Sequence, residues 1–294
     1  MLAQVRTGAV RGVDAFLVHV EVHIVSGLPA FAVVGLAQGS VREGRERVGA
    51  ALRTTGFGLP ARRITVNLAP ADVRKDGTAF DLPIAIGILV AAGHVAAESV
   101  HRHAFLGELG LDGSLRPVSA VLPIAAECRN AGIDTLVVPA DNAAEAAVVQ
   151  GLRVLAAEGL PDVVGHLAGR RSLEPVRVDA VRLLAGPATG HPDLADVRGQ
   201  AAAKRALEIA AAGGHNLLMI GPPGAGKTML ARRLPGILPA LSLDEALEAT
   251  RVHSVAGRLR GGGLLTQRPF RAPHHSVSYA GLVGGGRPVR PGEL

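Results

Sequence analysis

Residues 217–228 read Leu-Leu-Met-Ile-Gly-Pro-Pro-Gly-Ala-Gly-Lys-Thr, and the interpretation of the whole chain starts from them. Residues 217–220 are all apolar, which predicts a short strand buried on both faces. Residues 221–228 fit G-x-x-x-x-G-K-[ST], the pattern of a phosphate-binding loop that leads into a helix. A glycine-rich turn could match by chance, but the flanking apolar run and amphipathic stretch both lie where the motif needs them.

The residue types of this loop suit the binding of phosphate. Glycines at 221, 224 and 226 let the backbone turn tightly and point N–H groups at an anion. Lys227 would reach the β- and γ-phosphates, and the Thr228 hydroxyl would ligate Mg²⁺. We therefore predict ATP and Mg²⁺ as cofactors, with a nucleotide site formed by Gly221, Pro222, Pro223, Gly224, Ala225, Gly226, Lys227, Thr228 and Met229.

Composition limits the class of protein. A chain of 294 residues with 48% hydrophobic residues predicts about two domains with packed cores. Aromatic residues make up only 2%, so stacking on nucleic-acid bases is excluded as the main binding device. The single cysteine, Cys128, excludes an internal disulfide framework and a cysteine-based zinc site, and we expect it to be buried. No signal peptide is recognised, and residues 82–97 are too short to span a bilayer, which predicts a cytoplasmic protein without a membrane partner.

The net charge of +6 is concentrated in the last segment. Residues 251–294 contain seven arginines and one acid, Glu293, which leaves 24 basic and 24 acidic residues in 1–250. A local surplus of positive charge favours an anionic partner, either nucleic acid or nucleotide phosphate. The alternative is a solvated arginine-rich loop.

Periodicity predicts an α/β architecture for residues 1–168. Strands are expected within 2–25 and at 64–68 and 135–138, helices at 39–55, 122–131 and 141–150, and a hairpin around Asp112 and Gly113. An apolar helix is expected to end near 97. His19, Glu21 and His23 share one strand face, a spacing that suits a metal, but without a further ligand a solvated polar face is preferred. Residues 169–192 are predicted to be a linker because they are rich in Pro, Gly and Arg.

The second domain is predicted to span residues 193–294. A helix is expected at 200–212, and another from the phosphate-binding loop to about Leu234, where Pro235 ends it. Ser242 and Glu245 have the spacing of a capping box at the start of a further helix.

Long runs in this domain resemble the AAA+ ATPases related to magnesium chelatase, specifically the YifB/ComM group. The matching runs are Asp196-Val-Arg-Gly-Gln200, the stretches 204–216 and 230–238, His253-Ser-Val-Ala-Gly257, Arg268-Pro-Phe-Arg-Ala-Pro-His-His275 and Gly284-Gly-Gly286. The resemblance covers essentially the whole chain and implies an ATPase that works as a homo-oligomeric, hexameric ring.

The N-terminal domain resembles the proteolytic domain of Lon, through Lys75-Asp-Gly77, Gly107-Glu108, residues 132–139 and Asn142. The Lon active site consists of a Ser nucleophile and a Lys base. The resemblance places Ala79 at the first position and Leu122 or Ile124 at the second, and none of these side chains can attack a carbonyl or accept a proton. We predict a Lon-like fold without peptidase activity.

One part of the family pattern is missing from this chain. The family continues past Glu293 into an apolar strand ending in Asp-Glu, the Walker B motif, and then into sensor residues and an arginine finger. These groups hold Mg²⁺ and position the attacking water. We therefore predict no catalytic residues within this chain, weak nucleotide binding, and little or no hydrolysis by the chain as a fragment.

Three functions follow from the resemblance. The first is a DNA-acting motor for branch migration in recombination or transformation, with Arg268, Arg271, His274 and His275 as the DNA-contact candidates. The second is a protein-remodelling subunit of the chelatase type. The third is a nucleotide-binding fragment without turnover. Without a third ligand near the paired histidines, a metal site at His274 and His275 is disfavoured.

Overall fold

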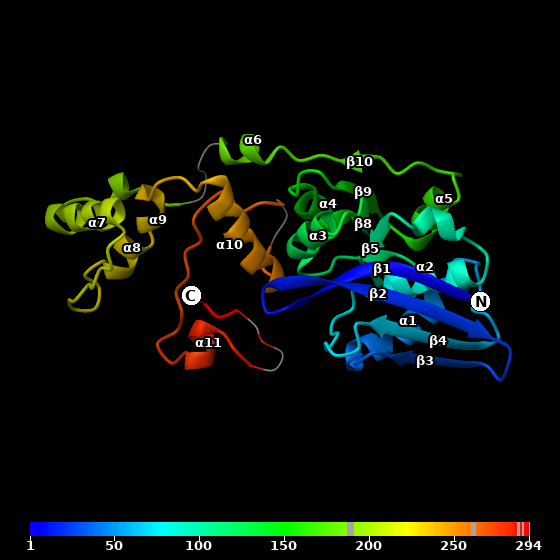
Figure 1. The fold of residues 1–294 in the computed structure, drawn as a ribbon. Helices are drawn as coiled ribbons and strands as arrows, with labels where there is room; N and C mark the ends of the chain where they lie inside the picture. The colour runs from blue at the N-terminus through cyan, green and yellow to red at the C-terminus, as the bar shows by residue number, and fades with distance from the viewer. Residues whose placement is uncertain (187–190, 260–262, 287–288, 290, 294) are drawn as a thin grey trace. The chain divides into compact units, whose positions relative to one another are not determined.

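The computed structural model describes residues 1–186, 191–259, 263–286, 289 and 291–293. The chain divides into two compact units (Figure 1). The first contains Met1–Val178, Arg251–Gly263 and Gly285–Pro291, and the second contains Asp179–Thr250, Leu264–Gly284 and Gly292–Leu294. Within the described residues, no helix has both the length and the hydropathy needed to cross a bilayer.

A mixed eight-stranded sheet organises the first unit. Across the sheet the order is β10 (Pro175–Val176), β9 (Arg153–Ala157), β8 (Thr135–Pro139), β5 (His103–Phe105), β1 (Leu2–Arg11), β2 (Asp14–Val25), β4 (Arg63–Ala69) and β3 (Ala30–Val34). Strand pairs β9–β8, β8–β5, β5–β1 and β4–β3 are parallel, and the other pairs are antiparallel. A separate two-stranded hairpin, β6 (Glu108–Leu109) with β7 (Leu115–Arg116), surrounds Asp112 and Gly113 as expected.

Helices cover both faces of this sheet. A side chain at Gly87 in α2 (Asp81–Ala91) would meet Val22, and one at Gly8 in β1 would meet Ile124 of α3 (Val121–Asn130). A β-carbon at Gly87 would also lie 3.8 Å from Val5, and residues 5 and 8 of one strand point to opposite faces. The two helices therefore lie on opposite faces, and the predicted α/β class is confirmed.

The remaining helices of the first unit are α1 (Gly39–Thr54), α4 (Ala140–Ala147), α5 (Leu160–Leu167) and the 3₁₀ helix η1 (Ala97–Val100). All eleven residues of α2 are buried, which explains why this segment is apolar on every side. Cys128 is buried, as expected. Strands β3 and β9 and helix α5 were not anticipated, and the expected linker contains β10 and α6 (Ala180–Leu184).

The second unit is helical in its described residues, which contain no strand. Besides α6 it holds η2 (Leu194–Asp196), α7 (Ala201–Gly213), α8 (Lys227–Ala231), α9 (Leu234–Ile237) and α11 (Tyr279–Val283). Helix α10 (Leu243–Val255) begins in this unit, and its residues from Arg251 onward belong to the first unit. The capping box is confirmed, because the Ser242 N–H donates to Glu245 (2.9 Å) and the Glu245 N–H donates to the Ser242 hydroxyl (3.2 Å).

Candidate nucleotide site

The loop at 221–228 turns through two glycines in the left-handed region. Gly224 has φ +79° and Gly226 has φ +83°, conformations in which a β-carbon is strained. Helix α8 begins directly afterwards at Lys227. The order of turn, lysine and helix is therefore the one that the sequence pattern predicts.

Lys227 folds back over this loop. Its Nζ donates hydrogen bonds to the carbonyl oxygens of Gly221 (2.8 Å) and Pro222 (2.7 Å). The lysine is half-buried, and hydrogen bonds to neutral carbonyls stabilise the loop only modestly. Phosphate oxygens make stronger, charge-assisted partners for an ammonium group than neutral carbonyls do. The lysine is thus held at the loop by bonds that an anion can replace.

A small apolar cluster anchors the helix that follows the loop. Leu230 is buried against Leu194, Val197 and Leu207, which come from the segment before α7 and from α7 itself. Polar contacts add to this anchor. The Arg233 Nε donates to the Asp193 carbonyl (2.8 Å), Arg233 Nη1 donates to the Met229 carbonyl (3.0 Å), and the Gln200 amide donates to the Ala225 carbonyl (3.5 Å). Residues of the Asp196–Gln200 run thereby support the loop.

The expected buried strand at 217–220 is not formed. Leu218 is 83% exposed and Ile220 is 88% exposed. A strand exists only through hydrogen bonds to a neighbouring strand, and the described residues of the second unit provide none. The expected helix from the loop to Leu234 is also wrong, because α8 ends at Ala231 and a separate turn of helix, α9, begins at Leu234.

The four DNA-contact candidates lie in the second unit, and three of them already have partners there. Arg268 binds both carboxylate oxygens of Glu245 (3.0 and 3.2 Å) and the Pro239 carbonyl (2.9 Å). These contacts, led by the hydrogen bond from the Ser242 N–H, lower the pKa of Glu245. Arg271 donates to Glu293 (2.6 Å).

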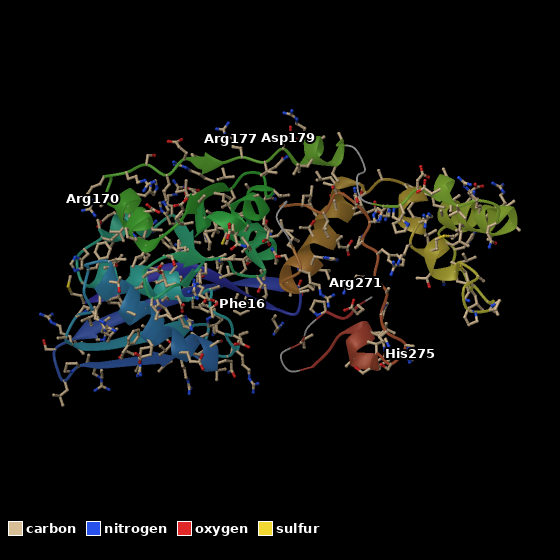
Figure 2. All side chains as sticks on the ribbon, turned by 180° about the vertical axis from the view of Figure 1, so that it is seen from behind. Phe16, Arg170, Arg177, Asp179, Arg271 and His275 are labelled. Carbon is tan, nitrogen blue, oxygen red and sulfur yellow. The ribbon has the colours of Figure 1, made fainter. Side chains whose placement is uncertain are left out.

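The two histidines stand next to each other. The His274 Nδ1 lies 2.7 Å from the Ser276 hydroxyl, and the His274 and His275 rings are 4.1 Å apart. Figure 2 labels Arg271 and His275 on the segment that leads to α11. Among the described residues, no group of three metal-ligating side chains is present, here or at His19, Glu21 and His23. Arg260, Arg287 and Arg290 of the basic segment lie outside the described residues.

Among its described residues, the first unit contains three buried ionisable groups that sequence reasoning did not identify as such. Asp81, 1% exposed, binds Arg47 through both carboxylate oxygens (2.6 and 3.1 Å) and accepts the Leu109 N–H (3.3 Å). Burial raises the pKa of Asp81 to about 6, against the opposing effect of Arg47. An acid inside an apolar helix was the available sequence signal.

Lys75 is the second of these groups. It is completely buried, and its Nζ has no hydrogen-bond partner in the part of the chain that the structure describes. Burial lowers its pKa, with Asp72 opposing the shift. Ala79 follows four residues later, and Leu122 and Ile124 are buried in α3. None of these three side chains can act as a nucleophile or a base, which is consistent with the predicted absence of peptidase activity. That absence stays a prediction.

Glu145 is the third. It accepts hydrogen bonds from the Leu122 N–H (2.8 Å) and the Ser254 hydroxyl, and burial raises its pKa. The Ala120 N–H also donates to the Ser254 carbonyl (3.0 Å). These bonds attach the 251–263 segment to the first unit beside a cavity of about 630 Å³. The His253-Ser-Val-Ala-Gly257 run therefore has a structural role in the first unit.

Comparison with known families and proteins agrees with the sequence runs. A family model described as subunit ChlI of Mg-chelatase matches residues 20–142, and a model described as magnesium chelatase, subunit ChlI, matches residues 193–294. The uncharacterized protein YifB of Salmonella typhimurium is 46% identical over 294 residues, which is 100% of this chain and 57% of that protein. The chain carries two domains of the magnesium chelatase ChlI family and is a homologue of YifB and ComM.

Two further relatives come from other bacteria. The competence protein ComM of Haemophilus influenzae is 46% identical over 295 aligned residues, covering 100% of this chain and 58% of ComM. The uncharacterized protein Rv2897c of Mycobacterium tuberculosis is 46% identical over 290 residues, covering 97% of this chain and 56% of that protein. This ChlI-family chain thus spans a little more than half the length of these relatives. The activity and partners of the complete proteins are therefore proposals for this chain.

Proposed function

We propose that this chain forms the nucleotide-binding portion of a ChlI-type AAA+ ATPase, with ATP and Mg²⁺ bound at residues 221–229. The observation that carries the proposal is Lys227, whose ammonium group rests on two neutral carbonyls of the Gly-rich turn that an anion can replace. Membership of the ChlI family supports the use of ATP and Mg²⁺. In this proposal Lys227 binds the β- and γ-phosphates and Thr228 supplies a hydroxyl ligand to Mg²⁺.

Binding and turnover are separate parts of the proposal. The residues described above can bind and orient phosphate, but none of them is an acid placed to activate water. We propose that the water-activating carboxylates belong to the region that the relatives have and this chain does not span. The chain alone is then expected to bind nucleotide with little or no hydrolysis, and a hexameric ring is a property we propose only for the complete protein.

Calorimetry with Mg-ATP tests the nucleotide site. The chain should bind, and Lys227→Ala should weaken binding by about ten- to a hundredfold, because an interaction between charged groups contributes about 1.5–3 kcal/mol. Lys204→Ala is the matched control, since Lys204 lies in α7 of the same unit. Thr228→Ala should remove most of the benefit of Mg²⁺. Unchanged binding in Lys227→Ala would show that the loop is not the nucleotide site.

We further propose that the complete protein is a DNA-acting motor for recombination or transformation. The basic surplus of residues 251–294 and the homology to a protein named for competence support this role. Arg268 and Arg271 form ion pairs with acids of the same unit. These pairs should lower the affinity for DNA, because DNA phosphates must displace Glu245 and Glu293.

A salt series on DNA binding checks this role. Affinity should fall steeply between about 50 and 200 mM salt, and Arg268→Gln with Arg271→Gln should reduce both the affinity and the steepness. Arg205→Gln in α7 is the control, because Arg205 is exposed and paired with Glu208 in the same unit. A flat salt response would argue against phosphate contacts.

A protein-remodelling chelatase subunit is the alternative, because both matching family models are named for magnesium chelatase. The complete protein distinguishes the two roles. ATPase activity stimulated by DNA supports the motor, whereas stimulation by a chelatase partner alone supports remodelling.

A further inference from the structure

The eight-stranded sheet of the first unit ends at β3, which is an open edge. Figure 1 shows β3 at the margin of the sheet, beyond β4, and in the described residues no strand pairs with its outer side. The Ala30 N–H donates toward β4, to the Arg62 carbonyl (3.4 Å). Backbone groups alternate along a strand, so the N–H and C=O groups of Phe31 and Val33 point outward.

This edge lacks the usual protection against pairing. Protected edges carry charges, prolines or bulges within the strand, whereas β3 reads Ala-Phe-Ala-Val-Val. Apolar side chains are also exposed at its ends, with Leu28 88%, Val34 46% and Leu36 48% exposed. An uncharged, apolar and unpaired edge is a template for another extended backbone.

A basic groove lies where β3 begins. It has a volume of about 300 Å³ and lies between the start of β3, helix α1 and the loop at 59–62. Three arginines line it, and Arg45 is paired with Glu46. Arg53 and Arg62 are exposed, and neither has an acidic partner among the described residues. Two uncompensated cations beside an apolar edge favour an anionic occupant.

We propose that β3 binds an extended acidic peptide segment of a partner protein, which adds a ninth strand and places carboxylates on Arg53 and Arg62. The outward N–H and C=O groups distinguish a peptide from nucleic acid, because only a polypeptide backbone matches them in register along the edge. This surface belongs to the first unit and is independent of the proposed nucleotide site.

Fluorescence anisotropy tests the charge. The probe is a labelled ten-residue peptide of alternating Val and Glu, and the control peptide has Lys in place of Glu. The full chain should bind the acidic peptide at least tenfold more tightly. Arg53→Glu with Arg62→Glu should weaken binding about tenfold or more. Arg177→Glu should not, because Arg177 is exposed just after β10, at the opposite edge of the sheet (Figure 2).

A second set of measurements tests the strand pairing. Val33→Pro removes an outward N–H and should abolish binding, while Val33→Ala should retain it. Where Val33→Pro fails to fold, peptides N-methylated at alternate positions replace it. Methyl groups on the N–H groups that face β3 should abolish binding, and methyl groups on the intervening N–H groups should leave it unchanged.

Three results would overturn the proposal. They are equal binding of the acidic and basic peptides, equal tolerance of methyl groups on both alternations, and binding of a single-stranded oligonucleotide, but not of the acidic peptide, that is lost in the double arginine variant. The last result would assign the groove to nucleic acid instead.

Discussion

Strand β8 and residues 217–220 are two short, mainly apolar runs that differ in burial and in strand formation. Thr135–Pro139 lies between β5 and β9 and is buried at all five positions. Leu218 and Ile220 are 83% and 88% exposed, and the described residues of the second unit offer them no strand to pair with. Apolar composition therefore produces a buried strand only where neighbours on both sides satisfy its backbone.

The largest expected effect is a loss of stability on truncating a leucine of β8, compared with the same change in residues 217–220. Leu136→Ala should lower the free energy of unfolding by about 2–5 kcal/mol, because it leaves a cavity in a close-packed core. Leu218→Ala should change it by less than about 0.5 kcal/mol, because the side chain is exposed. Urea denaturation of both variants measures the difference. Equal costs would mean that residues 217–220 are buried in solution.

The buried ion pair extends the comparison to charge. Arg47→Ala should destabilise the first unit by about 3 kcal/mol, because it leaves the Asp81 carboxylate buried without its partner. Replacing both residues, as Arg47→Ala with Asp81→Leu, should cost less than the single change. A double variant that is less stable than Arg47→Ala would show that the pair itself is strongly stabilising.

The pH dependence of stability sharpens this result. The pKa of Asp81 is raised to about 6, so between about pH 4 and 6 the folded state binds more protons than the unfolded state. The free energy of unfolding attributable to Asp81 should therefore fall as the pH rises through this window, by at most about 1.4 kcal/mol per pH unit. Thermal unfolding of the wild type and Asp81→Asn, measured side by side, isolates this slope. If the stabilities of the two proteins changed with pH in parallel, the raised pKa of Asp81 would be contradicted.

The smallest effect of a charge substitution is expected at an ion pair near the surface. Arg268→Ala should cost less than about 1 kcal/mol, because Arg268 and Glu245 pair near the surface, where water screens them. Replacing Glu245 should destabilise the second unit more than replacing Arg268, since Glu245 also accepts the capping hydrogen bond at the start of α10. A loss of more than about 2 kcal/mol in chemical denaturation would show that the pair is effectively buried.

Local signals predicted much of the first unit and the start of α10. Helix α1, expected at 39–55, occupies Gly39–Thr54, and the Ser242–Glu245 capping box closes as predicted. Both depend on residues within a few positions of each other. Strand β3 was missed because its five residues are all apolar, so the sequence shows no polar–apolar alternation, and because it pairs with β4, which lies almost thirty residues later.

The candidate site shows the same division. The turn at 224–226 and the start of α8 at Lys227 follow the motif, because glycine content and spacing are local. The partners of Arg268 and Arg271 could not be inferred, since Glu245 and Glu293 lie more than twenty residues away. Nucleotide binding and DNA contacts therefore stay predictions.

Periodicity, turn residues and the phosphate-loop spacing in the chain were sufficient for the α/β class and several element positions, and the long matching runs carried the family resemblance. Sheet order, the pairing of Arg47 with Asp81, and the attachment of residues 251–263 to the first unit required the folded molecule. The reason is physical. Local geometry depends on neighbours in sequence, whereas burial and charge pairing depend on which distant segments come together, and only packing selects those.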